Sequence, residues 1–217
     1  MHLLWCFLIG YGLGIINPAF IIGKIKGFDV RRRGSGNAGG SNALITMGKA
    51  IGFLCILLDI GKAFLAVKLT GLLFPGLPLV FPVTAAACIL GHMFPFYMGF
   101  SGGKGLACIG GCLLAYSPLW FLILLAAEAA LALAVNYICV VPISASVLLP
   151  VLYGFHAHDP LGAVILGVVG VAIILKHVEN IRRILNGTEL HLSYLWNKDK
   201  ETKRQEAAIA LEEEKQS

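Results

Sequence analysis

Residues 161–183 read LGAVILGVVGVAIILKHVENIRR, and this stretch changes from wholly apolar to strongly polar at Lys176. Its first part, residues 161–175, carries no charged side chain at all. A membrane-spanning helix needs about 20 mostly apolar residues, so this pattern is typical of a transmembrane helix that reaches the membrane surface. The polar part predicts that the helix continues past the surface, where His177 and Asn180, three residues apart, share one helical face.

Apolar runs of the same kind recur along most of the chain. Two of them are atypical, because one is short and another contains Pro142 and Pro150, so we expect these two to be kinked, tilted or partly interfacial. We predict an all-α integral membrane protein with about seven transmembrane helices in a single domain, residues 1–195, followed by a charged cytoplasmic tail, residues 196–217. The other six runs are residues 3–22, 50–69, 79–96, 106–116, 119–135 and 138–153.

The composition argues against a soluble protein and against nucleic-acid binding. The 217 residues are 58% hydrophobic and only 13% charged, whereas soluble domains carry about 25% charged residues. The net charge of +5 comes from Lys and Arg that flank the apolar runs, without a basic face of interleaved aromatics. The six cysteines form no CxxC pair, and we expect them to act as small apolar side chains, without a disulfide framework or a metal site.

The distribution of Lys and Arg predicts the orientation in the membrane. They fall in alternate loops, while the loops near residues 70–78, 117–118 and 156–160 contain none. Because cytoplasmic loops carry the excess of Lys and Arg, we expect the N-terminus outside and the C-terminus in the cytoplasm. The tail is expected to form a solvated, frayed helix.

Three polar islands interrupt the apolar chain, at residues 34–42, 91–105 and 177–183. Their glycines let backbone N–H groups approach a ligand, and their Ser, Asn, His, Lys and Arg side chains add hydrogen-bond donors. The predicted topology places all three on the cytoplasmic side. We therefore predict one anion-binding site, assembled from the three islands at the membrane surface.

Each island also has a plainer interpretation. The arginines at residues 31–33 can serve only to fix topology and touch lipid phosphates. Lys104 is the only cation of its loop and can either clamp a phosphate or extend to the interface as a snorkelling lysine. His92 is either a catalytic group or a loop organiser. Within the membrane, Asp59 and Lys62 are three residues apart and are expected to neutralise each other, and like Glu128 they are interpreted as structural.

The ordered motifs of the islands resemble those of the bacterial acyl-phosphate-dependent glycerol-3-phosphate acyltransferases, the PlsY family. Gly-Ser-Gly-Asn begins at Gly34, Gly-His…Phe-Pro…Gly-Gly-Lys-Gly covers residues 91–105, and His-x-Glu-Asn-Ile-x-Arg…Gly-Thr-Glu covers residues 177–189. Asp-Ile-Gly-Lys at residues 59–62 matches as well, so the resemblance extends from Leu3 to about Glu189.

The resemblance implies transfer of a fatty acyl group from acyl phosphate to the 1-hydroxyl of glycerol 3-phosphate, without an acyl-enzyme and without a cofactor. The products are lysophosphatidic acid and phosphate, in phospholipid synthesis at the bacterial inner cell membrane. The partners it implies are the two substrates and membrane lipid, with no nucleic acid, and the active site lies on the cytoplasmic side.

The resemblance also implies roles for individual residues. The Gly102 and Gly103 amides, with Lys104 and two residues of the first island, would hold the phosphoryl end, and His177 and Asn180 would orient the glycerol phosphate. The predicted catalytic residues are Ser35, Asn37, Lys104, His177 and Asn180. The predicted substrate-binding residues are Gly36, Ser41, Asn42, His92, Gly102, Gly103, Gly105, Arg182 and Glu189.

One position departs from the family pattern. An arginine that contacts substrate phosphate stands three residues after the second Asn of the first motif, and here that position is Ile45. The departure leaves a second hypothesis open, a divergent relative with another acceptor or a non-catalytic one, such as a transporter or a lipid-binding scaffold. Transporters usually place polar groups near the membrane midplane, whereas nearly all of these lie at one side, which favours the enzyme.

Overall fold

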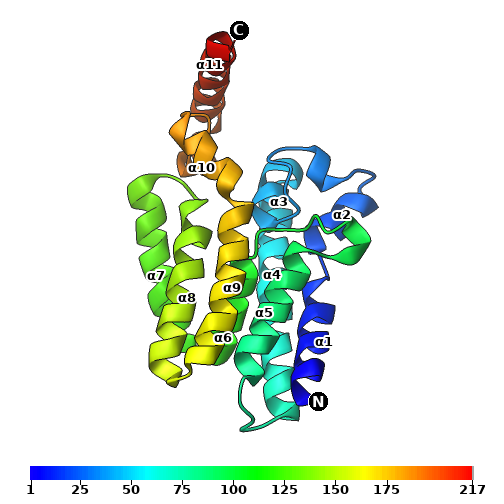
Figure 1. Cartoon of the computed structure of the whole chain (residues 1–217). Helices are drawn as coiled ribbons and strands as arrows, with labels where there is room; N and C mark the ends of the chain where they lie inside the picture. Colours follow the sequence, from blue (N-terminus) through cyan, green and yellow to red (C-terminus); the bar gives the residue numbers. More distant parts are fainter. Residues whose placement is uncertain (217) are drawn as a thin grey trace.

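In a computed structural model of the chain, which describes residues 1–216, every regular element is a helix (Figure 1). The α-helices are α1 (His2–Gly14), α2 (Pro18–Ile25), α3 (Gly40–Met47), α4 (Lys49–Leu73), α5 (Val80–Met93), α6 (Leu106–Tyr116), α7 (Pro118–Val135), α8 (Val140–Ala157), α9 (Pro160–Lys176), α10 (Val178–Leu185) and α11 (Lys198–Gln216). Three short 3₁₀ helices join them, η1 (Val30–Arg32), η2 (Phe96–Met98) and η3 (Leu192–Leu195).

The predicted all-α membrane architecture is confirmed, and each apolar run is largely helical. About seven spans are predicted, and five helical stretches in the described residues are, by length and composition, long and apolar enough to cross a membrane. A sixth is reached if α9 and α10, which meet at a bend of 46°, form one span. α6 has 11 residues, which at about 1.5 Å per residue is too short for a hydrocarbon core of about 30 Å. The five stretches are His2–Ile25, Lys49–Leu73, Val80–Met98, Pro118–Val135 and Val140–Ala157.

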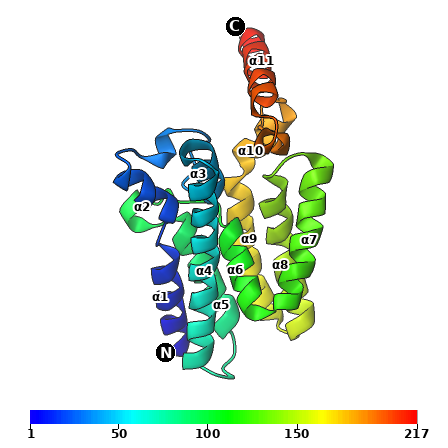
Figure 2. The same cartoon turned by 180° about the vertical axis from the view of Figure 1, so that it is seen from behind.

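The bundle has two halves joined by a short central helix. Figure 2 shows α1, α4 and α5 on one side, α7, α8 and α9 on the other, and α6 between them. The core between the helices is rich in Ala, Cys and Gly, and at Gly14 of α1 an added Cβ would strike the backbone of Cys88 in α5. Small residues of this kind let membrane helices approach closely where apolar burial gives no driving force.

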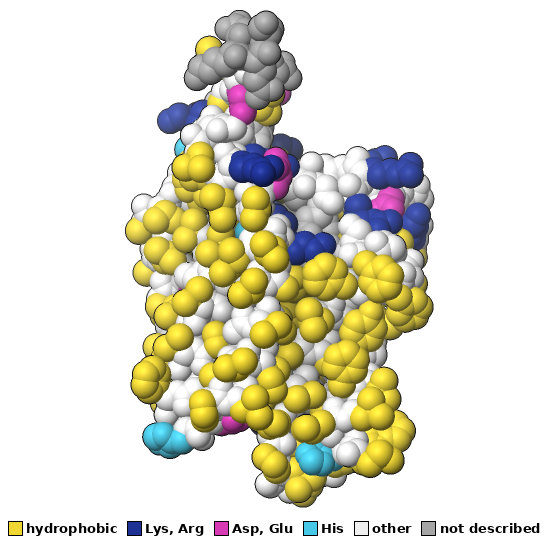
Figure 3. All heavy atoms as spheres, in the orientation of Figure 1, with side chains coloured by type: hydrophobic (Ala, Val, Ile, Leu, Met, Phe, Trp, Pro, Cys, Tyr) yellow, Lys and Arg dark blue, Asp and Glu magenta, His cyan; other side chains and the backbone are white. Residues whose placement is uncertain are grey.

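Charge is concentrated at one end of the bundle. Figure 3 shows an apolar outer surface along the helices and Lys and Arg side chains gathered at the end formed by α2, α3 and α10. The N-terminus lies at the opposite end, near the α4–α5 turn, whereas the C-terminus lies beyond the basic end (Figure 1). All three polar islands are therefore brought to the same end of the molecule.

Candidate active site

The second and third islands meet in a direct contact between two side chains. Lys104 Nζ, in the loop before α6, donates a hydrogen bond to Asn180 Oδ1 on α10. Asn180 Nδ2 in turn donates to Glu189 Oε1 at 2.6 Å, and these two residues are only 8% and 7% exposed. A lysine ammonium has three N–H donors, so two of them remain for a ligand. Burial lowers the pKa of Lys104, opposed by the carboxylate of Glu189.

Lys104 is positioned by the glycine that follows it. Gly105 caps the N-terminus of α6 with φ of +93°, a left-handed conformation that glycine adopts without strain. The first N–H groups of any α-helix have no intrahelical acceptor, so those at the start of α6 lie next to the lysine without one. A cation beside a helix N-terminus is an arrangement that favours an anion.

His177 lies at the junction of α9 and α10 and is 1% exposed. Its Nδ1 is 2.8 Å from the carbonyl oxygen of Ile173, one turn earlier in α9. Because a carbonyl oxygen can only accept, Nδ1 carries the hydrogen in this contact, and Nε2 of the neutral ring keeps its lone pair. The imidazole can therefore accept a hydrogen bond from a hydroxyl group.

The first island is held together by a single buried amide. Asn42 Nδ2 lies 2.8 to 3.0 Å from the carbonyl oxygens of Val30, Arg33 and Asn37, and its Oδ1 accepts the N–H of Ser35 at 2.8 Å. Asn42 is fully buried and its amide hydrogens are used inside the protein, which leaves it inaccessible to a ligand. The prediction that Asn42 contacts substrate is therefore corrected to a positioning role, in which it shapes the loop that carries Ser35 and Asn37.

The residues of this loop face outward at the basic end. Ser35, Gly36 and Ser41 are exposed and Asn37 is half-buried. Among the described residues, none of these four has a side-chain hydrogen bond to Lys104 or His177. Figure 3 shows a recess between the part of the basic end formed by α2, α3 and this loop and the part formed by α10 and α11, with Lys and Arg side chains at its rim.

An arginine ties the first island to the second. Arg31 pairs with Asp29 at 2.8 Å, and its Nη1 donates to the carbonyl oxygen of Met98 at 2.6 Å, in the segment that leads to Lys104. The hydrogen bond from Arg31 lowers the pKa of Asp29 to about 2. Arg31 is thus committed to holding two loops together and is a poor replacement for an arginine at Ile45.

The two glycine amides predicted to bind phosphate are used inside the protein. Gly102 N–H donates to Met93 O and Gly103 N–H donates to His92 O, both at 3.0 Å. These carbonyls lie at the C-terminus of α5, where a helix leaves its last acceptors unsatisfied. The prediction is therefore corrected: Gly102 and Gly103 close the end of α5. An added Cβ at Gly102 would strike the carbonyl oxygen of His92, and one at Gly103 would strike its imidazole ring.

A second buried polar cluster lies below this loop, made of Asp59, Lys62 and His92. Lys62 Nζ is 2.6 Å from Asp59 Oδ1 and 2.9 Å from His92 Nδ1, and it donates to the carbonyl oxygen of Ile16 at 2.5 Å. The predicted pairing of Asp59 with Lys62 is confirmed. His92 is 2% exposed and its Nδ1 faces this pair, which favours the loop-organising role over the predicted contact with substrate.

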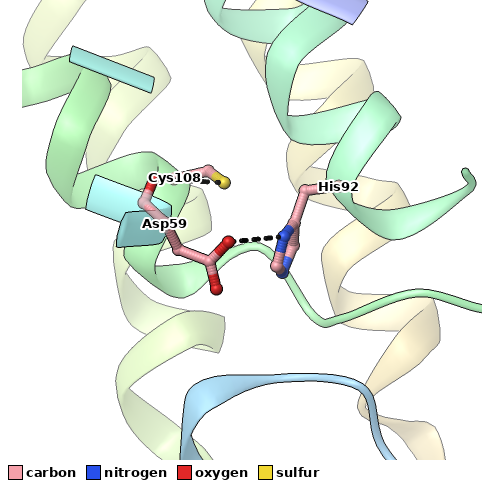
Figure 4. A group of neighbouring side chains, drawn as sticks. All are labelled: Asp59, His92 and Cys108. Carbon is pink, nitrogen blue, oxygen red and sulfur yellow. Dashed lines mark hydrogen bonds and ion pairs between the residues drawn. The ribbon is translucent and has the colours of Figure 1, made fainter. Parts of the chain in front are cut away.

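Cys108 adds a third possible metal ligand to this cluster. Figure 4 shows Asp59 and His92 directed toward one another with Cys108 beside them, and the three ligand atoms lie within 4.8 Å of one another. The ammonium of Lys62, however, contacts both Asp59 and His92. Its charge occupies the position that a metal cation would need and would repel one.

The remaining predicted ligand, Arg182, is peripheral. Its side chain is 72% exposed and lies 3.9 Å from Glu179, while Arg183 lies 3.4 Å from the same carboxylate. Arg33 places its guanidinium 4.2 Å from the ring centroid of Phe28. None of these contacts places an arginine next to Lys104 in the part of the chain that the structure describes.

Comparisons with known proteins match almost the whole bundle. A family model described as glycerol-3-phosphate acyltransferase matches residues 4–187. Glycerol-3-phosphate acyltransferase 2 of Thermotoga maritima is 36% identical over 195 residues, covering 85% of this chain and 94% of that protein. Glycerol-3-phosphate acyltransferase of Bacillus subtilis is 35% identical over 190 residues, covering 87% and 96%.

Solved structures agree with the sequence relatives. The crystal structure of PlsY (YgiH), an integral membrane glycerol 3-phosphate acyltransferase in its glycerol 3-phosphate form, has a TM-score of 0.81 at 34% identity. The match covers 89% of this chain and 96% of that one. The same protein in its lysophosphatidic acid form has a TM-score of 0.76. The family match ends before η3 and α11.

Proposed function

This chain belongs to the glycerol-3-phosphate acyltransferase family, and we propose that it transfers a fatty acyl group from an acyl phosphate to the 1-hydroxyl of glycerol 3-phosphate. The products of this reaction are lysophosphatidic acid and inorganic phosphate. The observation that carries the proposal is the contact between Lys104 and Asn180, at the N-terminus of α6 and beside a histidine with a free lone pair.

The proposed chemistry needs little covalent help from the protein. An acyl phosphate is a mixed anhydride, so phosphate is already a good leaving group. The 1-hydroxyl oxygen bonds to the acyl carbon, the bond from that carbon to the phosphate oxygen breaks, and the hydroxyl proton passes to the departing phosphate, which leaves as hydrogen phosphate. Catalysis then consists mainly of placing two anions side by side and stabilising the charge that develops.

The described side chains divide these tasks. Lys104 and the first N–H groups of α6 neutralise phosphoryl oxygens, since an ammonium and a helix N-terminus both favour negative charge. Asn180, held by Glu189, keeps the ammonium in place. His177 Nε2 accepts a hydrogen bond from the glycerol phosphate and orients it, because its Nδ1 is already bound to Ile173.

The first island supplies the remaining contacts of the proposed site. Ser35 and Asn37 lie on the exposed loop shaped by Asn42, across the recess from α10. Their side chains and the exposed backbone at Gly36 and Ser41 hold the second phosphate group. The acyl chain lies between helices, in the lipid.

The concentration of Lys and Arg at this end supports a cytoplasmic orientation of the site in a bacterial cell membrane. In this arrangement the N-terminus lies outside and the charged tail inside. Both substrates then reach the site from the cytoplasm or the inner leaflet, where their phosphate groups are solvated.

The test is release of phosphate from palmitoyl phosphate by the purified full-length protein, with and without glycerol 3-phosphate. We expect release that depends on the acceptor, that is strongly reduced in Lys104→Ala, and that is unchanged in Lys26→Ala, which removes an equal charge from the exposed end of α2. Phosphate release that does not depend on glycerol 3-phosphate would indicate a hydrolase. A panel of other phosphorylated polyols identifies a different acceptor, the alternative that Ile45 raises.

A further inference from the structure

The helix α11 lies outside the residues matched by the family, yet it contacts the candidate site. In Figure 1 it projects from the bundle beyond α10. The tail was predicted to be a solvated helix, but Glu201 in its first turn is only 6% exposed. Its first two turns therefore pack against the protein.

The contact is made with a single turn of backbone. Arg204 Nη1 donates to the carbonyl oxygen of Gly187 at 2.9 Å, and its Nη2 donates to that of Glu189 at 2.6 Å. Gln205 Nε2 donates to the carbonyl oxygen between them, that of Thr188, at 3.0 Å. Three consecutive carbonyl groups in the turn that follows α10 are thus each bound by a side chain of α11.

The start of α11 is itself fixed, so these donors are held in place. Glu201 accepts hydrogen bonds from Arg204 Nε and Ser193 Oγ, both at 2.9 Å, and lies 3.1 Å from His191 Nδ1. The N–H of Ser193 donates to Asn136 Oδ1 at 3.0 Å, in the loop between α7 and α8. The tail is therefore anchored to the bundle independently of the third island.

The turn that α11 holds carries Glu189. The backbone of Glu189 is bound by Arg204, while its carboxylate is bound by Asn180, which in turn accepts from Lys104. The four residues form a continuous chain of contacts from the tail to the ammonium. A guanidinium that binds two carbonyls at once constrains the turn more than a single donor would, because its donors are fixed in one plane.

We propose that α11 is a positioning element of the substrate site, in which Arg204 and Gln205 fix the turn at residues 187–189 and thereby place Glu189, Asn180 and Lys104. The kinetic side of this proposal depends on the proposed function. The structural side does not, because it concerns the order of the turn alone.

The main variant is Arg204→Ala in the full-length protein, with Lys203→Ala as a matched control. Lys203 is exposed on the same helix and carries the same charge. Losing charge-assisted hydrogen bonds to the turn should displace Lys104, which holds the phosphoryl end of the donor. We therefore expect KM for the acyl phosphate to rise about threefold to tenfold in Arg204→Ala, with KM for glycerol 3-phosphate within about twofold. Arg204→Lys keeps the charge but not the two-carbonyl geometry, and should fall between Arg204→Ala and the wild type.

A second measurement separates this proposal from the proposed function. Hydrogen–deuterium exchange of residues 185–190 should become faster in Arg204→Ala and stay unchanged in Lys203→Ala, whether or not the protein transfers acyl groups. Unchanged exchange and unchanged KM in Arg204→Ala would overturn the proposal. An equal rise of exchange across α4 and α5 would also overturn it, because it would mean general destabilisation. If the wild-type protein shows no acyl transfer, the proposed function is rejected. The hydrogen–deuterium exchange result alone then tests whether α11 positions the turn.

Discussion

Two lysines of this protein, the buried Lys62 and the half-buried Lys104, have opposite surroundings. Lys62 lies among α4, α5 and the α1–α2 junction, and contacts Asp59, His92 and a backbone carbonyl. Lys104 lies in a loop at the basic end, and one neutral side chain, Asn180, is the acceptor found for it among the described residues. The first ammonium is saturated by the protein, whereas the second retains donors.

The difference separates a structural cluster from a binding one. A buried charge is tolerated when it is paired and hydrogen-bonded, and the ammonium of Lys62 meets both conditions with groups from three parts of the chain. In the Lys104 cluster the carboxylate of Glu189 is hydrogen-bonded to Asn180, which lies between it and the ammonium. An anionic ligand would complete the hydrogen bonding of Lys104, and nothing comparable is missing at Lys62.

The largest expected effect comes from breaking the Lys62 cluster. Lys62→Met keeps the length of the side chain but leaves Asp59 buried without its cation, which we expect to destabilise the protein by about 3–5 kcal/mol. Thermal stability in detergent measures the change, and activity should fall with the fraction of folded protein. The double variant Asp59→Asn with Lys62→Met should recover much of the stability, because no charge is then left unpaired. A Lys62→Met protein as stable as the wild type would contradict the comparison.

The same substitution in the Lys104 cluster, Lys104→Met, should reduce activity and leave stability almost unchanged. Lys104→Met removes the ammonium that we propose contacts substrate, and the loss of one such electrostatic contact costs about 2.7–4 kcal/mol of transition-state stabilisation, about a hundredfold or more in rate. Thermal stability should change little, because Asn180 retains Glu189 as a partner. Since burial lowers the pKa of Lys104, wild-type activity should also decline at a less alkaline pH than a solvent-exposed lysine would allow. A Lys104→Met protein that unfolds like Lys62→Met would assign both lysines a structural role.

Much of the fold follows from the sequence because hydropathy is a local property. All seven apolar runs are largely helical, and the bounds of residues 106–116 coincide with those of α6. The sequence alone does not fix the span count, because an apolar run of 11 residues such as α6 is shorter than a membrane-spanning helix usually needs. The short helix α3 has no apolar run that would predict it. The helical continuation at α10 follows from the sequence, but its bend of 46° to α9 does not.

The site was predictable where motif and topology agreed. Lys104 and Asn180 belong to motifs that the predicted topology places on the same side of the membrane, so their contact could be expected. The amides of Gly102 and Gly103 could not be assigned, because their partners are the last carbonyls of α5, and the loop geometry decides whether they reach them. The link from Arg204 to Glu189 was also out of reach, since the tail has no motif and its contacts are to backbone.

The smallest expected effect concerns the position where this chain lacks the family's arginine. Ile45 lies on α3, one turn after the exposed Ser41, so Ile45→Arg places a guanidinium on the helix face that Ser41 occupies. A phosphate clamp of this kind is worth about 1.5–3 kcal/mol, so we expect kcat/KM for glycerol 3-phosphate to rise about tenfold to a hundredfold. Ile45→Lys should give less, because it offers charge without a bidentate fork, and Ile45→Met should give nothing. Equal increases of kcat/KM from Ile45→Lys and Ile45→Arg would mean that the site lacks only a positive charge and does not need the bidentate geometry. No gain from either would mean that Lys104 and its neighbours already bind a different phosphorylated acceptor, which the polyol panel would then identify.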